Sequence, residues 1–241
     1  MNSKQIVTNV IIGISVLFIS CSKQVSIIQD PIEESETINN GAISYLALGD
    51  SYTIGEGVEE SRRWPNQLAV KLAENNISVG QSKIIAKTGW TTRNLTDAIE
   101  GADLSNLEGE LLVSLLIGVN NQYQKLDFNA FKTEFDLLVD KSMQLAVTSD
   151  RVFVVSIPDY GVTPFGSNNS VQIGQDIDMY NQYMSNKCEQ LKIPFVDITE
   201  ISRELGDSAD ALASDKLHPS GYQYEKWVDE IFPVVIKLLS E

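Results

Sequence analysis

Residues 43–51 read ISYLALGDS, a mostly apolar run that ends in a glycine, an acid and a serine. A short apolar run closed by glycine predicts a buried β-strand followed by a tight turn. In open sheets of parallel strands, ligands bind beyond the carboxyl ends of the strands. The sequence therefore predicts that Ser51 stands at the functional edge of a sheet.

Strand and helix patterns alternate after this run. Alternation of this kind specifies a parallel sheet with helices on both faces. We therefore predict a three-layer α/β/α sandwich of the flavodoxin-like type, with a five-stranded parallel sheet, over residues 43–241. The other expected strands are 82–86, 110–118, 151–157 and 195–198, and the expected helices are 64–74, 91–99, 129–146, 175–191 and 222–239.

The composition narrows the class of partner. The chain has 241 residues and a formal net charge of -15. A chain of this length can bury a full core as one domain of about 200 residues. Its acidity argues against binding to nucleic acid, which needs clustered lysine and arginine, and against electrostatic docking on anionic lipid. We interpret the acidity as an aid to solubility.

The first residues have the pattern of a targeting segment. Lys4 precedes an apolar run, residues 6–19, which ends in a small residue and then Cys21. This arrangement resembles a bacterial lipoprotein signal, in which residues 1–20 are removed and Cys21 carries the lipid. A plain secretory signal and an uncleaved anchor are the alternatives. Residues 21–42 are polar and acidic, so we expect the lipidated cysteine and a flexible tether. The expected location is extracytoplasmic, on a bacterial membrane.

Cysteine and histidine are too few for a zinc site. The chain contains only Cys21, Cys188 and His218 of these two residue types, and they are far apart. Standard zinc sites need four such ligands at characteristic spacings. We therefore expect no metal and no cofactor. Cys188 lies in a helical pattern, and we expect it to be a small buried residue rather than a reactive thiol.

The single histidine lies in residues 215–222, DKLHPSGY. A histidine can take the proton of a serine and so make it a nucleophile. Asp215 stands three residues before His218, close enough on one turn to reach Nδ1 and leave Nε2 facing a serine. Asp50 is the rival acid, but it is adjacent to Ser51, and we assign it to loop structure. The alternative is that a lone histidine is structural or merely exposed.

Two further segments carry polar groups to the same predicted edge. Residues 87–92 read KTGWTT and follow the second strand, and residues 118–121 read GVNN and follow the third. A glycine at position 89 allows the backbone close to a ligand. The alternative reading of Gly89 is an ordinary glycine in a strand-to-helix turn.

Together the four segments resemble the SGNH (GDSL) hydrolase family, a branch of the serine esterases and lipases. The resemblance extends from residue 43 to the C-terminal helix, and the chain lacks the Gly-x-Ser-x-Gly elbow of α/β-hydrolases. It implies the SGNH hydrolase fold and three catalytic residues, Ser51, Asp215 and His218. It also implies an oxyanion hole formed by the N–H groups of Ser51 and Gly89 and the side chain of Asn120.

One position departs from the family pattern, Gly-x-Asn-Asp. Asn121 stands where the acid usually is. The substitution leaves the donor role of Asn120 intact, but it puts in doubt the hydrogen bonding that the acid provides to hold the loop.

The resemblance implies an ester hydrolase acting on a small ester or acylated substrate. Family members act on short-chain esters, acetylated sugars, lysophospholipids and thioesters, and the sequence does not choose among these. We expect Tyr160 and Phe165, after the fourth strand, to line a substrate pocket with Trp90 opposite. The alternative is that these rings pin a loop against the core. A second hypothesis for the whole chain is a catalytically silent lipoprotein that uses the fold for binding.

Overall fold

The computed structural model describes residues 42–107 and 109–240, apart from the side chain of residue 149. All of them belong to one unit of the chain, residues 39–241. The predicted signal segment 1–20, the lipidation site Cys21 and the tether up to residue 41 lie outside the described residues.

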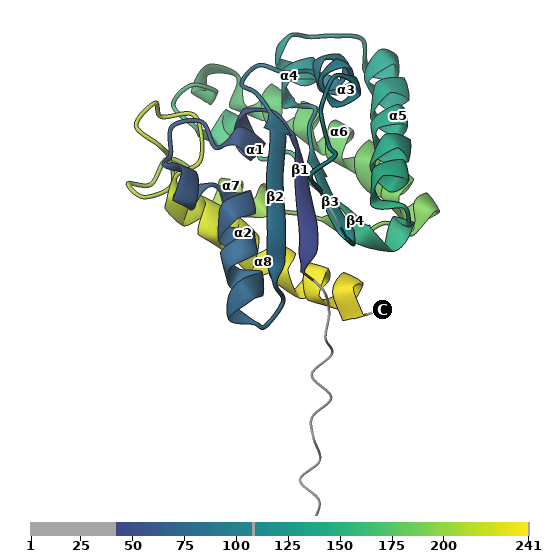
Figure 1. The fold of residues 1–241 in the computed structure, drawn as a ribbon. Coiled ribbons are helices and arrows are strands. Elements are labelled where there is room, and N and C mark those ends of the chain that lie inside the picture. The colour runs from purple at the N-terminus through teal and green to yellow at the C-terminus, as the bar shows by residue number, and fades with distance from the viewer. Residues whose placement is uncertain (1–41, 108, 241) are drawn as a thin grey trace, which may run out of the picture. The chain divides into compact units, whose positions relative to one another are not determined.

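A five-stranded sheet forms the centre of the fold, and every strand pairs in parallel (Figure 1). The strand order is β2-β1-β3-β4-β5, so the chain changes direction across the sheet between β1 and β3. This is the flavodoxin-like order, and the predicted fold class is confirmed. The strands are β1 (Ile43–Gly49), β2 (Val79–Ala86), β3 (Leu111–Leu116), β4 (Val152–Val155) and β5 (Phe195–Val196).

Strand β1 lies between β2 and β3, and all seven of its residues are buried. Side chains of a strand alternate between the two faces of a sheet, so a strand covered on both faces is apolar almost throughout. The tyrosine at position 45 remains compatible with this burial because its hydroxyl is 2.9 Å from the hydroxyl of Ser114 on β3. The ISYLALG run therefore becomes a central strand because each face of it meets a helical layer.

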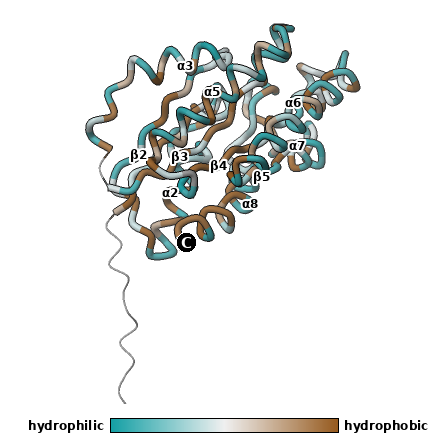
Figure 2. Tube along the Cα trace, turned by 90° about the vertical axis from the view of Figure 1, so that its right-hand side faces the viewer, coloured by the Kyte–Doolittle hydropathy of each residue, from teal (hydrophilic) through white to brown (hydrophobic). Residues whose placement is uncertain are grey.

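The helices cover both faces of the sheet. Figure 2 shows α2 and α8 on one side of the sheet and α3 and α5 on the other. The longer helices are α2 (Trp64–Glu74), α3 (Thr92–Glu100), α5 (Phe128–Ala146), α6 (Ser170–Leu191) and α8 (Gly221–Ser240). The short ones are α1 (Ser51–Ile54), α4 (Val119–Tyr123) and α7 (Thr199–Leu205), with single 3-10 turns at Glu60–Arg62, Ser149–Arg151, Tyr160–Val162 and Ser167–Asn169.

The short helices are the main departure from the sequence prediction. Helices α1 and α4 have too few residues to show an apolar period, so the hydrophobic pattern of the sequence does not predict them. Helix α6 begins at Ser170, five residues before the predicted start at position 175, because Ile173 and Ile177 continue its buried face toward the N-terminus. Strand β3 ends at Leu116, two residues before Gly118, whose φ of 126° suits only glycine.

Cys188 is fully buried on α6, as expected, and this burial raises the pKa of its thiol to about 12. Within residues 42–240, leaving out position 108, no helix has both the length and the apolar character needed to cross a membrane.

Candidate active site

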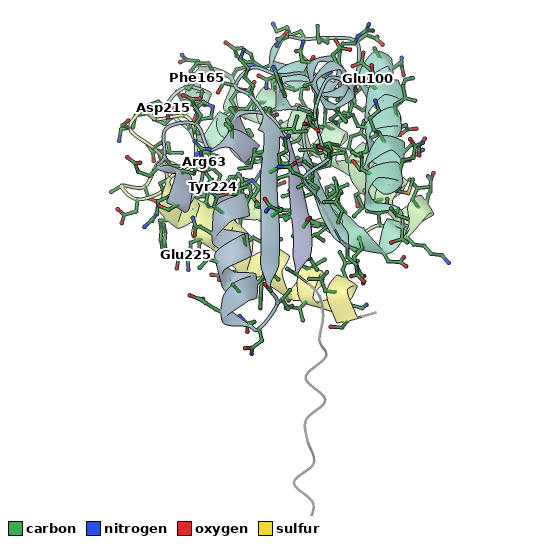
Figure 3. All side chains as sticks on the ribbon, in the orientation of Figure 1. Arg63, Glu100, Phe165, Asp215, Tyr224 and Glu225 are labelled. Atoms are coloured by element: carbon green, nitrogen blue, oxygen red, sulfur yellow. The ribbon has the colours of Figure 1, made fainter. Side chains whose placement is uncertain are left out.

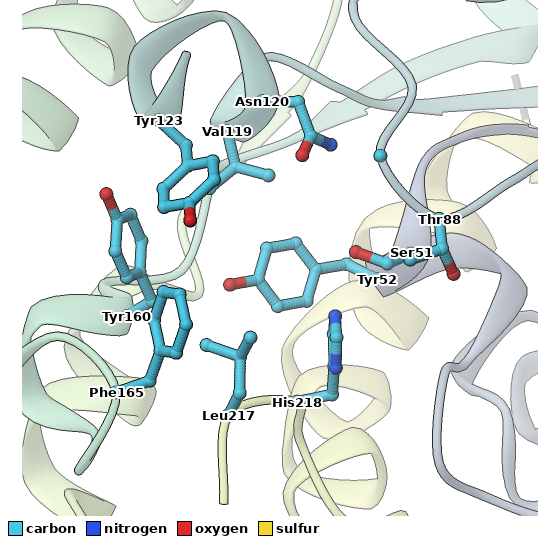
Figure 4. A pocket seen from close by; sticks show the side chains of 11 residues that line it. Ser51, Tyr52, Thr88, Val119, Asn120, Tyr123, Tyr160, Phe165, Leu217 and His218 are labelled. Atoms are coloured by element: carbon cyan, nitrogen blue, oxygen red, sulfur yellow. The ribbon is translucent and has the colours of Figure 1, made fainter. Parts of the chain in front are cut away.

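A cavity of about 290 Å³ opens at the carboxyl edge of the sheet. Figure 4 shows Ser51, Asn120 and His218 around it, with their polar groups directed inward. Segments that are far apart in the sequence meet here, and Figure 3 shows Phe165 and Asp215 at this same end of the molecule. The lining residues are Ser51, Tyr52, Thr88, Gly89, Val119, Asn120, Tyr123, Tyr160, Phe165, Leu217 and His218.

Ser51 is the first residue of α1, directly after the turn that ends β1. The side chain of Asp50 caps this helix, since its Oδ1 accepts a hydrogen bond of 3.0 Å from the N–H of Tyr52. The first N–H groups of a helix have no partner within it. The Ser51 N–H therefore has no partner within the helix, and Ser51 itself lines the cavity.

Asp215 holds the imidazole of His218 at its Nδ1 atom. Oδ2 of Asp215 is 2.7 Å from Nδ1 of His218, and Oδ1 accepts from the N–H groups of Leu217 and His218, both at 3.0 Å. Burial alone would raise the pKa of Asp215, but these hydrogen bonds outweigh it and hold the pKa below its ordinary value. An ionised carboxylate at Nδ1 fixes the orientation of the ring and leaves Nε2 toward the cavity.

Gly89 and Asn120 bring two further polar groups to the cavity. Gly89 has a φ of 83°, and a side chain there would point into open space, so its backbone borders the cavity directly. Nδ2 of Asn120 donates to the carbonyl of Trp90 at 2.9 Å. A side-chain amide has two N–H groups, so this bond orients Asn120 and leaves a second donor for a ligand.

Asn121, which stands where the family pattern has an acid, is hydrogen-bonded through both ends of its side-chain amide. Its Oδ1 accepts from the N–H of Thr92 at 3.0 Å, and its Nδ2 donates to the Thr92 hydroxyl at 2.7 Å. The Thr92 hydroxyl donates in turn to Glu134 on α5. Asn121 and Thr92 are both buried, so this chain of hydrogen bonds ties the Gly89 loop to the Asn120 loop.

Tyr160 and Phe165 lie in the wall of the cavity, at the position that their place after β4 indicated. Trp90 does not lie there, which corrects the expectation from the sequence. Its side chain packs against the hydrophobic core, and only its carbonyl contributes to the site, through Asn120. Position 90 lies in the turn after β2, where side-chain direction follows no fixed period, so adjacency to Gly89 did not determine where the Trp90 ring points.

Tyr123 and Leu217 also line the cavity, and the sequence analysis missed both. Tyr123 is three residues after Asn120, and one helical turn places residues three apart on the same face. That spacing was the available signal, but it needed helix α4 to be known. Leu217 precedes His218 directly.

Asp50 is a capping residue and not a partner of the histidine. Its side chain is fully buried, and this burial raises its pKa to about 7, against the opposing effect of the N–H of Tyr52. The structure therefore agrees with the assignment of Asp50 to loop structure. Among the described residues there is also no group of three or more histidine, cysteine, aspartate or glutamate side chains that could hold a metal.

The chain belongs to the GDSL-like lipase/acylhydrolase family, whose model it matches over residues 47–226. It is therefore an ester hydrolase, built on the α/β/α fold described above. Comparison with curated protein sequences finds no match.

Several solved structures share the fold. The psychrotrophic esterase EstA from Pseudoalteromonas sp. has 18% sequence identity, with 82% of this chain and 99% of that chain covered and a TM-score of 0.61. A family 3 carbohydrate esterase from Clostridium thermocellum has 22% identity, coverage of 83% and 98%, and a TM-score of 0.63. A lipase/acylhydrolase from Enterococcus faecalis has 16% identity, coverage of 79% and 94%, and a TM-score of 0.60.

The buried carboxyl of Asp50 predicts a pH-dependent stability. The folded chain holds this proton up to about pH 7, whereas the ordinary pKa is 3.8. The contribution of this group to stability is therefore complete below about pH 4 and is lost as the pH rises to about 7. Asp50→Asn removes that dependence. As the pH rises from 4 to 8, the free energy of unfolding of the wild type should therefore fall by up to about 4 kcal/mol relative to that of the variant. Urea unfolding across this range measures it, and parallel pH profiles would contradict the raised pKa.

The Asn121–Thr92–Glu134 chain predicts a coupling between positions 121 and 134. Asn121→Asp replaces a donor with an acceptor, so two carboxylates compete for one hydroxyl proton, and the free energy of unfolding should fall by about 1–3 kcal/mol. Adding Glu134→Gln supplies a donor from the other side and should restore most of the loss. A double-mutant cycle in urea tests this, and additive effects at the two positions would refute the coupling.

Proposed function

We propose that the protein hydrolyses carboxylic esters through an acyl-enzyme on Ser51, with His218 as the base and Asp215 as its partner. One observation carries the proposal. Ser51, Asn120 and His218 come from three distant segments and line one cavity, while Asp215 holds the far nitrogen of the imidazole at 2.7 Å. That combination is the one that makes a serine nucleophilic.

In the first half-reaction, Nε2 of His218 takes the proton of the Ser51 hydroxyl as its oxygen bonds to the ester carbonyl carbon. The carbonyl oxygen becomes an oxyanion, for which the N–H groups of Ser51 and Gly89 and the amide of Asn120 are the proposed donors. The bond from carbon to the alcohol oxygen then breaks, and the alcohol leaves with the proton from His218. The acyl group stays on Ser51 as an ester.

The second half-reaction repeats these steps with water. His218 takes a proton from water as its oxygen bonds to the acyl carbon, and the same donors hold the oxyanion. The bond to Ser51 breaks, the serine recovers its proton from His218, and the carboxylic acid is released. Asp215 remains ionised throughout, which its lowered pKa favours, and it stabilises the imidazolium in both halves. Each oxyanion donor is typically worth about 3–4 kcal/mol of the barrier.

The catalytic assignment predicts a graded loss of activity. Ser51→Ala and His218→Ala should each lower kcat for p-nitrophenyl acetate by about 10⁶-fold, in practice to background, because each removes a group that forms or breaks a bond. Asp215→Asn should leave more activity, with a loss of about 10⁴-fold, since it disturbs the tautomer and not the nucleophile. Retention of most of the rate by His218→Ala would overturn the mechanism.

A fluorophosphonate probe tests the nucleophile directly. It should label the wild type at Ser51, detected as one added mass on the peptide that contains residue 51, and it should not label Ser51→Ala. Ser61→Ala, a change at an exposed serine on a 3-10 turn, is the matched control and should label normally. A wild type that reacts with no phosphonate and hydrolyses no ester would instead favour the catalytically silent binding protein.

We further propose that the protein is a lipoprotein held outside the cytoplasm on a bacterial membrane, facing the periplasm or the cell surface, through Cys21. The support is the sequence alone: a charged start, an apolar run and a small residue before the cysteine. Expression in a bacterium fed an alkyne-bearing fatty acid should give labelled protein in the membrane fraction. Cys21→Ser should abolish both the label and the membrane fraction, while Cys188→Ala, the control at the buried cysteine, should change neither. Equal labelling of Cys21→Ser would contradict the anchor.

A further inference from the structure

A second depression, of about 500 Å³, lies beside the catalytic cavity. The two hollows share three aromatic residues, Tyr123, Tyr160 and Phe165. The ring centre of Tyr123 is 5.8 Å from that of Phe165 and 6.2 Å from that of Tyr160. The ring centres of Tyr160 and Phe165 are 6.3 Å apart. The three rings therefore pack together as an aromatic partition, with the serine and histidine on one side (Figure 4) and the second depression on the other.

The far side of the partition differs in chemistry from the catalytic side. The catalytic cavity is walled mainly by apolar and aromatic side chains. The second depression is lined beyond the partition mostly by amide and charged side chains. These are Gln122, Lys125, Asn168, Asn169, Gln172 and Asp176.

Hydrogen bonds hold the partition in place. The Tyr160 hydroxyl donates to Oε1 of Gln122 at 2.8 Å, and Nε2 of Gln122 donates to Oδ2 of Asp176 at 2.9 Å. Oδ1 of Asp176 accepts from Nε2 of Gln172 at 2.8 Å. Burial raises the pKa of Tyr160 to about 12, so its hydroxyl keeps the proton that it donates. Both carboxylate oxygens of Asp176 thus accept hydrogen bonds from neighbouring amides, and the carboxylate helps to hold the partition in place.

The charges of the depression do not favour an ionic ligand. It has one lysine and one aspartate, in a chain whose net charge is -15. Phosphate and carboxylate groups need a cluster of cations or a fork of arginine donors. Asn168 and Asn169 carry both donors and acceptors without charge, which matches hydroxyl groups, since these also donate and accept.

The aromatic partition adds an apolar platform to these amides. Tyr123 and Phe165 are 53% and 51% exposed, so two large rings present open surface between the hollows. Neutral ligands that are rich in hydroxyls and also have faces of C–H groups, as saccharides do, fit rings on one side and amides on the other.

We propose that the second depression is a binding site for the alcohol part of the substrate and that this part is a neutral, hydroxyl-rich group of the saccharide class. The acyl group lies in the apolar catalytic cavity, and the alcohol part crosses the partition to Asn168 and Asn169. The inference rests on the proposed ester hydrolysis, because it assigns the two halves of the ester to the two hollows.

The first experiment compares two esters with the same acyl group, 6-O-acetylglucose and p-nitrophenyl acetate. In Asn168→Ala/Asn169→Ala, which leaves the hydrogen bonds of the partition in place, kcat/KM for acetylglucose relative to p-nitrophenyl acetate should fall about tenfold, because two hydrogen bonds to the sugar are lost. Asn186→Ala is the matched control: it is the same change at an exposed asparagine on α6 that bonds to Gln182 outside the depression, and it should leave the ratio unchanged. An unchanged ratio in the double variant overturns the proposal. So does a selective loss for long-chain p-nitrophenyl esters, which would place the acyl chain in the depression.

A second measurement is independent of turnover. Saturation-transfer NMR on Ser51→Ala, which keeps the ligand intact, should show contact between acetylglucose and the protein, and the contact should weaken when Asn168→Ala and Asn169→Ala are added. No contact with Ser51→Ala refutes the saccharide site even when p-nitrophenyl acetate is hydrolysed by the wild type. Contact in a protein that hydrolyses no ester would refute the proposed function and keep the binding site.

Discussion

The parallel register of β1 with its two neighbours is the constraint on which the site depends. Gly49 at the end of β1 pairs with Ala86 on one side and with Leu116 on the other. Ser51, Gly89 and Asn120 follow these three positions within a few residues, so one register brings all three to the same edge. A slip of one residue would reverse the faces of a strand and remove its polar group from the cavity. The buried apolar faces of β1 and β3 prevent such a slip, and hydrophobic burial therefore sets the positions of polar atoms.

Local hydrogen bonds then refine what the register places only coarsely. Asn120 is bound to the Trp90 carbonyl, and Asn121 binds Thr92 from both ends of its amide, so two adjacent loops are joined twice. The Asn121 position also shows how a departure from the family pattern is accommodated. The Thr92 hydroxyl accepts from the Asn121 amide and donates to Glu134 on α5, so this buried polar group has partners for both roles.

The aromatic partition gives the site two chemically different sides. Its rings belong to α4 and to the segment after β4, and its hydrogen bonds reach α6 through Gln122 and Asp176. Three elements thus meet at one wall, and none of them carries a member of the proposed serine, histidine and aspartate triad. Substitutions in these three elements can change the side of the partition proposed to bind the alcohol part and leave the groups that make and break bonds unchanged. Segments outside the core of a rigid scaffold commonly determine specificity in this way.

The sequence by itself determined the parts that depend on short-range order. The apolar runs indicated five strands, the glycine turn put a serine beyond β1, and Asp215 was paired with His218 because three residues of one turn bring them into reach. The tertiary structure alone decided the contacts between distant segments. The Trp90 side chain packs against the core, whereas Tyr123 lines the cavity. Thr92 is hydrogen-bonded to Glu134, 42 positions away in the sequence, and Gln122 to Asp176, 54 positions away. Such contacts arise from how helices pack on the sheet, and no local spacing in the chain encodes that packing.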